Sequence, residues 1–201
     1  MAALSALFGS TIDGHVTVIQ SLHRLRPVLE RIAESMSQAV LDGKKILWCG
    51  NGGSAADAQH LAAELVGRFL KERRALPSIA LSTNTSVLTA IGNDYGYDFV
   101  FHRQVEALCV PGDVVVGIST SGTSRNVCKA LEAGRRLGAH TIAFTGMRSS
   151  VMDDIADEVL AVPSSETPRI QEAHILCGHM LCDYIERRVC DVEVAKQQFS
   201  R

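Results

Sequence analysis

With 201 residues, of which 46% are apolar and 21% charged, the chain is long enough to bury one sizeable core. Its formal net charge of -2 gives no electrostatic footprint for nucleic acid, and its apolar runs are far shorter than the roughly 20 residues of a membrane span. We therefore expect no nucleic acid and no membrane among its partners.

The six cysteines have no C-x-x-C spacing, so neither a zinc ribbon nor a disulfide framework is indicated. They are expected to be buried thiols in a reducing compartment. Residues 1–7 lack the basic and apolar segments of a secretory signal. A cytoplasmic location is therefore predicted.

An amphipathic helix is predicted from Ile12 to Leu41, because apolar residues recur there at i, i+3, i+4 and i+7. Pro27 is expected to divide or bend it, and Asp42-Gly43 to end it. Since no strand precedes this helix, its apolar face needs either the body of the domain or another copy of the chain. We assign residues 1–43 to an N-terminal helical extension and residues 44–201 to a single compact domain.

The first strand–turn–helix unit consists of a short apolar run at residues 44–49, a glycine turn at residues 50–54 and a helix at residues 55–69. The glycines allow a ligand to approach the backbone, and Ser54 is placed either to cap the helix or to contact an anion. The spacing is not G-x-G-x-x-G, and no acidic residue ends the next apolar run, residues 78–82. A dinucleotide site is therefore a poor fit.

A second unit has the same order, with a strand at residues 113–118, the hydroxyl-rich turn Ser119-Thr120-Ser121-Gly122-Thr123-Ser124 and a helix at residues 125–137. Free backbone N–H groups, hydroxyls and a positive helix end converge there, which favours a phosphate ligand. The alternative is that these residues only cap the helix, but capping requires fewer hydroxyls.

The remaining elements complete an alternating pattern of strands and helices. Residues 92–96 are expected to form a polar turn between helical segments, residues 141–146 and 158–162 two more strands, and residues 169 to about 189 a final helix after Thr167-Pro168. This alternation predicts an α/β fold, a three-layer α-β-α sandwich around a five-stranded parallel sheet. Both polar turns then lie at one edge of the sheet.

His60 and Glu64 are four residues apart on a predicted helix, so they project from one face. Alone, such a pair is more often a surface pairing than a metal site. On the last helix, Gln171, His174 and His179 add further donors. Gln171 and His179 lie about 12 Å apart along the helix. They meet at one ion only by reaching from opposite sides; otherwise they serve different copies of the site in an oligomer.

These motifs occur in order and with family spacing between Ile12 and Val189. The chain resembles the phosphoheptose isomerases, also called sedoheptulose 7-phosphate isomerases, of the sugar isomerase (SIS) domain superfamily. The resemblance rests on residues 49–54, the segment from Gln59-His60 to Glu64, Gly92-Asn93-Asp94, residues 117–124, residues 169–172 and His179.

The resemblance implies a homotetramer with active sites at subunit boundaries and one zinc ion per subunit. It implies His60, Glu64, Gln171 and His179 as zinc ligands, with Glu64 as base and His179 as acid. The residues implied in substrate binding are Asn51, Gly52, Gly53, Ser54, Glu64, Asn93, Asp94, Ser119, Thr120, Ser121, Ser124 and Gln171.

The implied reaction converts sedoheptulose 7-phosphate, a phosphorylated ketose, to glycero-manno-heptose 7-phosphate through an enediolate. It is the first step of nucleotide-activated heptose synthesis, which serves lipopolysaccharide or another glycoconjugate. One departure from the family is Glu166-Thr167-Pro168, where some members carry an acidic residue directly before the arginine.

The alternative function is a non-catalytic tetrameric scaffold, such as the replication-initiator-associating proteins of the same superfamily, or a sugar-phosphate sensor. Those scaffold proteins lack the full ligand set, whereas all four positions here hold metal-competent side chains. The fold alone does not separate these functions. Metal content and aldose formation from a ketose 7-phosphate would separate them.

Overall fold

The computed structural model describes residues 2–147 and 150–199. It contains a five-stranded parallel sheet with the strand order β2-β1-β3-β4-β5. The strands are β1 (Ile46–Gly50), β2 (Ser78–Ala80), β3 (Val114–Ile118), β4 (His140–Thr145) and β5 (Glu158–Ala161). The predicted sheet is thus confirmed, with each strand within two residues of its expected bounds.

The central strands are buried on both faces. Every residue of β1 and β3 is buried, as expected for apolar strands of a parallel sheet covered on both sides by helices. Neighbouring strands pair without a bulge, with Gly50 opposite Ile118 at the ends of β1 and β3. Because parallel strands end together, the turns after these two strands lie side by side.

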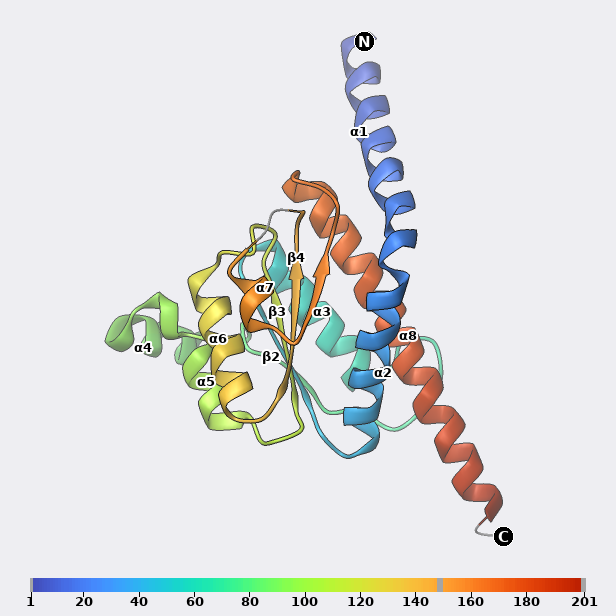
Figure 1. Cartoon of the computed structure of the whole chain (residues 1–201), viewed down its shortest axis with the longest axis vertical. Coiled ribbons are helices and arrows are strands. Elements are labelled where there is room, and N and C mark those ends of the chain that lie inside the picture. The colour runs from blue at the N-terminus through green and yellow to red at the C-terminus, as the bar shows by residue number, and fades with distance from the viewer. Residues whose placement is uncertain (1, 148–149, 200–201) are drawn as a thin grey trace.

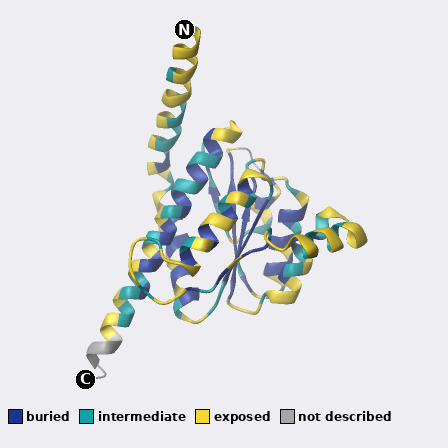
Figure 2. Cartoon of the chain, turned by 180° about the vertical axis from the view of Figure 1, so that it is seen from behind, coloured by how far each residue is buried: buried dark blue, intermediate teal, exposed yellow. Residues whose placement is uncertain are grey.

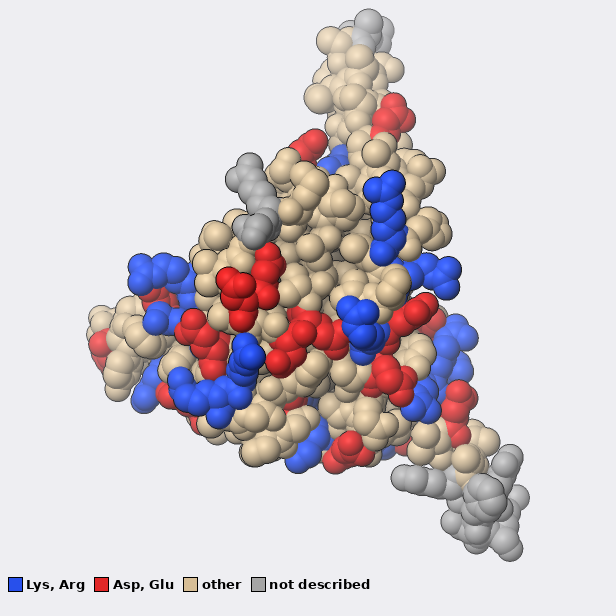
Figure 3. All heavy atoms as spheres, in the orientation of Figure 1, with Lys and Arg blue, Asp and Glu red and all other residues tan. Residues whose placement is uncertain are grey.

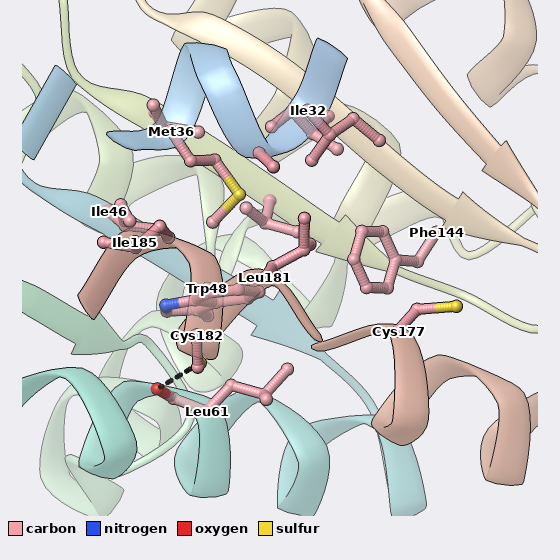
Figure 4. Packing of buried hydrophobic residues seen from close by; sticks show 14 of the residues in the cluster. Ile32, Met36, Ile46, Trp48, Leu61, Phe144, Cys177, Leu181, Cys182 and Ile185 are labelled. Carbon is pink, nitrogen blue, oxygen red and sulfur yellow. Dashed lines mark hydrogen bonds between the residues drawn. The ribbon is translucent and has the colours of Figure 1, made fainter. Parts of the chain in front are cut away.

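Two helical layers cover the sheet (Figure 1). One contains α2 (Arg26–Leu41), α3 (Gly53–Val66) and α8 (Thr167–Phe199), and its core surrounds the fully buried Trp48. Figure 4 shows Ile32, Leu61 and Phe144 packed around this core. The other layer contains α5 (His102–Leu108), α6 (Arg125–Arg136) and α7 (Met152–Ile155), which pack on the opposite face of the sheet.

The N-terminal helix begins ten residues earlier than predicted and is interrupted. α1 (Ala2–Ser21) is followed by a 3-10 turn, η1 (Leu22–Leu25), and then by α2. The break directly precedes Pro27, which lies in the first turn of α2, where its missing N–H costs no helical hydrogen bond. The expected division at this proline is confirmed. α2 packs on the main core, whereas α1 projects beyond it (Figures 1 and 2).

Two other helices differ from the predictions. Residues 92–95 form the last turn of α4 (Thr85–Tyr95), not a polar turn, because Asn84 caps the helix start and the chain reverses only at Gly96, at φ 86°. The 3-10 turn η2 (Tyr97–Phe99) follows. The last helix includes Thr167 as its first residue and extends to Phe199, ten residues past the predicted end.

The distribution of charged residues on the surface agrees with the small net charge of the chain, -2. On the face shown in Figure 3, basic and acidic residues are interspersed over the domain body, while the projecting helix is almost uncharged. Among the described residues, no helix combines the length and the apolar character needed to cross a membrane.

Candidate active site

The two polar turns lie side by side, as predicted. Asn51 in the glycine turn and Asn126 in the first turn of α6 exchange side-chain hydrogen bonds, each 2.9 Å long. The hydroxyl of Tyr97 donates a third bond, 3.3 Å long, to Oδ1 of Asn51. These amides join the ends of β1 and β3 into one polar surface.

The hydroxyl turn is organised around its own side chains. The Oγ atoms of Ser119 and Ser124 are 2.9 Å apart, and the Oγ of Ser121 is 3.0 Å from Oγ1 of Thr123. Ser124 precedes α6 but makes no side-chain capping bond, so its hydroxyl does not serve as a helix cap. The amides of Thr120 and Ser121 donate to no residue that the structure describes. The turn therefore offers both hydroxyls and N–H groups to an anion.

Gly122 has a φ of 66°, and a Cβ there would lie 2.3 Å from the Cβ of Ser150. Only glycine fits this position, so the tight curvature of the turn depends on it. On the other side of the turn, Thr120 and Ser121 line a small pocket of about 100 Å³ with Thr167 and Ile170. The hydroxyl turn is thus adjacent to the start of α8.

The glycine turn leads directly into α3. Gly52, at φ 55°, is the residue before the helix, and Ser54 lies inside the first turn, where it is buried. Of the two roles expected for Ser54, capping of the helix is wrong, because the cap position falls two residues earlier at Gly52, and contact with an anion stays a prediction. A Cβ on Gly53 would lie 2.4 Å from Nε2 of Gln171, so the absence of a side chain makes room for that amide.

Helices α3 and α8 run side by side in the same direction. Gly53 contacts Gln171 near their starts, and His60 contacts His179 two turns further along. Between these contacts, a Cβ on Gly178 would lie 2.5 Å from Cδ1 of Leu61, so glycine permits the close approach. This packing brings together side chains that are far apart in the sequence.

His60, Glu64 and His179 form one cluster. Their ligand atoms all lie within 4.8 Å of one another. Nε2 of His60 is 2.9 Å from Nε2 of His179 and 3.3 Å from Oε1 of Glu64. The side chain of His60 is 49% exposed and that of Glu64 22%, so the cluster is open to a ligand from one side.

This donor set fits a divalent metal. Two imidazoles and one carboxylate are a known set for catalytic zinc, and donors about 2.0–2.2 Å from one tetrahedral ion stand roughly 3.4 Å apart, close to the spacing here. Asp57, one turn before His60, has a buried Oδ2 with no partner among the described residues. Burial raises the pKa of the Asp57 carboxyl, and His60 opposes that rise.

The structure does not bring all predicted site residues to this cluster. The amide of Gln171 lies against Gly53, two turns away along α8. Asn93 and Asp94 are exposed and bonded to each other at the end of α4. α4 lies on the opposite side of the molecule from α8 in both cartoon views (Figures 1 and 2). The placement of these residues in the active site stays a prediction.

Three residues near the site were not singled out from the sequence. They are Asp57 beside His60, Tyr97 on Asn51, and Phe69, whose ring stacks on His179 with centroids 5.4 Å apart and planes at 27°. Only the three-residue spacing of Asp57 and His60 on one helix was a usable signal. Tyr97 and Phe69 reach the site through long-range packing.

Comparisons with known proteins show which family the chain resembles. The SIS domain family matches residues 15–146. The phosphoheptose isomerase of Aquifex aeolicus is 59% identical over a region that covers 80% of this chain and 84% of its own. The phosphoheptose isomerase of Geotalea daltonii is 55% identical over 90% of this chain and 94% of its own.

Solved structures give the same result. Phosphoheptose isomerase from Neisseria gonorrhoeae superimposes with a TM-score of 0.85 at 45% identity, covering 90% of this chain and 99% of that one. The Vibrio vulnificus NanR protein complexed with ManNAc-6P, at 18% identity and a TM-score of 0.70, shares the fold. The chain belongs to the SIS domain family and, within it, to the phosphoheptose isomerases.

Proposed function

We propose that this isomerase converts sedoheptulose 7-phosphate to glycero-manno-heptose 7-phosphate. The observation that carries the proposal is the convergence of His60, Glu64 and His179, two turns along the helix that begins at the glycine turn, with the hydroxyl turn joined to that turn by Asn51 and Asn126. The curated relatives named phosphoheptose isomerase support the choice of a seven-carbon sugar phosphate. We expect the reaction to take place in the cytoplasm and its product to enter nucleotide-activated heptose synthesis, a route to lipopolysaccharide.

The chemistry sets three requirements. Moving a carbonyl from C2 of a ketose to C1 of an aldose removes a proton from C1 and delivers one to C2, while the proton of the C1 hydroxyl ends on the C2 oxygen. A base, an acid and a positive group near the two oxygens are needed. A zinc ion would supply that positive group as a Lewis acid.

We propose that His60, Glu64 and His179 hold one zinc per chain. Gln171, which lies two turns from these side chains within one chain, would be the further ligand if it reaches the ion from another copy in the oligomer. The proton-transfer roles belong to two of these residues, Glu64 as base and His179 as acid. A carboxylate that coordinates through one oxygen keeps the other free, and an imidazole that coordinates through one nitrogen keeps the second free. We therefore expect either that bound substrate would loosen or replace at least one protein ligand, or that the second imidazole nitrogen of His179 would exchange the proton.

The hydroxyl turn would hold the phosphate. Ser119, Thr120, Ser121 and Ser124 present hydroxyls there, and the amides of Thr120 and Ser121 are open to an anion. In the glycine turn, Asn51, Gly52 and Gly53 would contact the sugar. Binding the phosphate at a fixed point orients C1 and C2 toward the base and the acid.

We further propose a homotetramer whose active sites lie at subunit boundaries. Large apolar side chains of α1 are exposed, with Leu4, Leu7, Phe8 and Ile12 each more than half accessible. A second copy would cover them and could bring Asn93 and Asp94 to a neighbouring site. Light scattering should give four copies, and a fully active monomer at nanomolar concentration would contradict this assembly.

The alternative of a scaffold or sensor has less support. The likeness to the NanR protein, at 18% identity, shows only a shared fold. The three-residue donor cluster has a direct use in an isomerase and none in a scaffold, so the enzyme is favoured.

The experiment measures turnover of sedoheptulose 7-phosphate by Glu64→Gln and His179→Ala. Each should lower kcat at least ~100-fold, the usual contribution of a lost acid or base. Glu72→Gln and His23→Ala, which change an exposed carboxylate and an exposed imidazole, should leave kcat unchanged. Near-normal turnover in either site variant would refute its assigned role.

Solvent deuterium gives an independent result. A proton taken up from an exchanging base or acid should place deuterium at C2 of the aldose. A product without deuterium would favour direct hydride transfer between the carbons, or a proton shielded from solvent.

A further inference from the structure

A fully buried ion pair, Arg73 and Glu186, lies near the donor cluster at the end of α3. Arg73, in the segment after α3, and Glu186, on α8, each have a side chain with 0% exposure. Nε of Arg73 is 3.3 Å from Oε1 of Glu186 but does not form a hydrogen bond with it, so this contact is electrostatic. Replacing such a buried pair with apolar residues is often neutral or stabilising. Stability alone therefore does not account for it.

Glu186 binds the backbone that follows α3. Its carboxylate accepts N–H bonds from Phe69 at 2.9 Å, Leu70 at 2.7 Å and Lys71 at 2.7 Å. Burial opposes ionisation of Glu186, but these three bonds and the Arg73 charge outweigh it, so the pKa of Glu186 lies below its usual value. Three consecutive N–H groups around one carboxylate fix the path of this segment.

Arg73 binds the end of α3. It donates to the carbonyl of Glu64 at 2.8 Å and to that of Gly67 at 2.9 Å. The last carbonyls of a helix have no partner within the helix, and Arg73 satisfies two of them here. One of these carbonyls belongs to a residue of the donor cluster itself.

The same segment carries Phe69 to His179. The Phe69 amide is bonded to Glu186, and its ring stacks on the His179 imidazole. Glu186 follows His179 by seven residues, about two helical turns, so both lie on the same side of α8. Glu186 and Phe69 thus connect α8 to the backbone after α3 on the side where His179 faces His60.

We propose that Glu186 and Arg73 are positioning residues, which set the spacing of α3 and α8 and hold Phe69 against His179. They touch neither substrate nor metal. Their effect passes through the Glu64 backbone and the Phe69 ring to the three side chains of the donor cluster. The part of this inference that concerns zinc rests on the proposed function, whereas the orientation of His179 does not require a metal.

The main variant is Glu186→Gln, which keeps the side-chain volume, turns a nitrogen donor toward the N–H groups and leaves Arg73 unpaired. Zinc affinity, measured by chelator competition, should fall 10- to 100-fold, the usual range for residues that orient metal ligands. In the metal-free protein, the ring signals of His179 in NMR spectra should lose the shift caused by the Phe69 ring. Glu186→Asp, which keeps the charge, should retain part of the zinc affinity and part of the ring-induced shift of the His179 signals.

Two further variants separate positioning from stability. Phe69→Leu leaves the ion pair intact and should still remove the NMR shift of His179 and weaken zinc binding. Asp113→Asn is the matched control, because Asp113 is also fully buried, pairs with Lys45 at 2.6 Å and accepts two backbone N–H bonds, but lies directly before the central strand β3 and not between α3 and α8. It should lower Tm without changing zinc affinity or the His179 signals.

The outcomes are distinct. A Glu186→Gln protein that loses Tm like Asp113→Asn, yet keeps wild-type zinc affinity and His179 signals, would overturn the proposal. Should Glu186→Gln fail to fold, unchanged zinc affinity and His179 signals in Phe69→Leu would overturn it equally. If the wild-type protein binds no zinc, the proposed metal centre fails, but the NMR comparison in the metal-free protein still decides whether Glu186 positions His179.

Discussion

The Nε2 atoms of His60 and His179 are 2.9 Å apart, although 119 residues separate the two histidines in the chain. The rings meet edge to face, with planes at 67°. Two imidazole nitrogens at this distance share one proton or bind one cation, because two protonated nitrogens would repel each other.

The first prediction is that the wild-type chain binds one zinc ion and His60→Ala loses it. Removing one of the protein ligands should lower zinc affinity by more than the 10- to 100-fold range typical of residues that only orient the ligands. Elemental analysis measures the zinc content of both proteins. Activity before and after chelation shows whether the reaction requires the metal.

His140→Ala is its control, because His140 also contacts two carboxylates, Asp157 and Glu158, but at the opposite edge of the sheet. Equal zinc content in His60→Ala and wild type would rule out this centre. Full activity after chelation would rule out a metal requirement.

A second prediction concerns the phosphate. Ser119→Ala and Ser124→Ala should each weaken binding, because a lost hydrogen bond to a charged group costs about 1.5–3 kcal/mol, or roughly 10- to 150-fold. KM for the sugar phosphate and Kd for inorganic phosphate measure this, and the second quantity isolates the phosphate from the rest of the sugar.

Ser35→Ala should bind phosphate normally, since Ser35 bonds to Glu158 at the other edge of the sheet. If the double variant Ser119→Ala/Ser124→Ala bound phosphate as tightly as wild type, phosphate would not occupy this turn.

Local sequence signals were enough to predict the sheet and the two turns. Apolar runs that end in glycine or hydroxyl clusters marked four of the five strands, and strand alternation placed both turns at one edge, as the Asn51–Asn126 pair confirms. The errors are also local. Gly92-Asn93-Asp94 contains turn-forming residues, but a side-chain cap at Asn84 and the reversal at Gly96 keep this segment helical.

The assembly of the site was harder to predict because it depends on how α3 packs against α8. Spacing indicated that His60 and Glu64 share a helix face, but it could not bring His179 to them. The contact of Gln171 with Gly53 and the burial of Glu186 against Phe69 depend on the parallel pairing of the two helices. Periodicity within one segment contains no information about such pairing.

A third prediction follows from that pairing. Gly53→Ala should displace the Gln171 amide, whose Nε2 would lie 2.4 Å from the new Cβ. Because the end of a flexible side chain can move, stability should change little, while kcat/KM should fall, because Gly53 and Gln171 both belong to the proposed substrate-binding residues.

Gly178→Ala is the contrasting variant, since its Cβ would lie 2.5 Å from the buried Leu61 and should lower Tm clearly. Wild-type kcat/KM in Gly53→Ala would remove Gln171 from the functional residues.

The last prediction concerns acid sensitivity and a histidine outside the donor cluster. His174 on α8 is fully buried, and its Nε2 lies 3.1 Å from the Thr145 carbonyl, the acceptor for its ring N–H. Nδ1 is buried and has no hydrogen-bond partner among the described residues. Burial lowers the pKa of His174 to about 4, against the opposing effect of the bond to Thr145.

The direction of the effect follows from proton linkage. In the unfolded chain, His174 takes up a proton at its ordinary pKa, near 6.5. In the folded chain, its pKa is about 4, so it takes up the proton only in more acidic solution. Neutral His174 therefore stabilises the fold fully above pH 6.5. This stabilisation is lost as the pH falls toward 4, which lowers the free energy of unfolding by about 3 kcal/mol.

His174→Gln keeps a donor for Thr145 but does not titrate in this range. Urea unfolding at about pH 7 and about pH 4.5, at one protein concentration because oligomers unfold in a concentration-dependent way, should show a smaller acid loss for His174→Gln than for wild type. His23→Gln, at an exposed histidine, should retain the wild-type pH dependence. The groups common to all three proteins cancel in the comparison. Equal losses in His174→Gln and wild type would show that His174 does not resist protonation in the folded state.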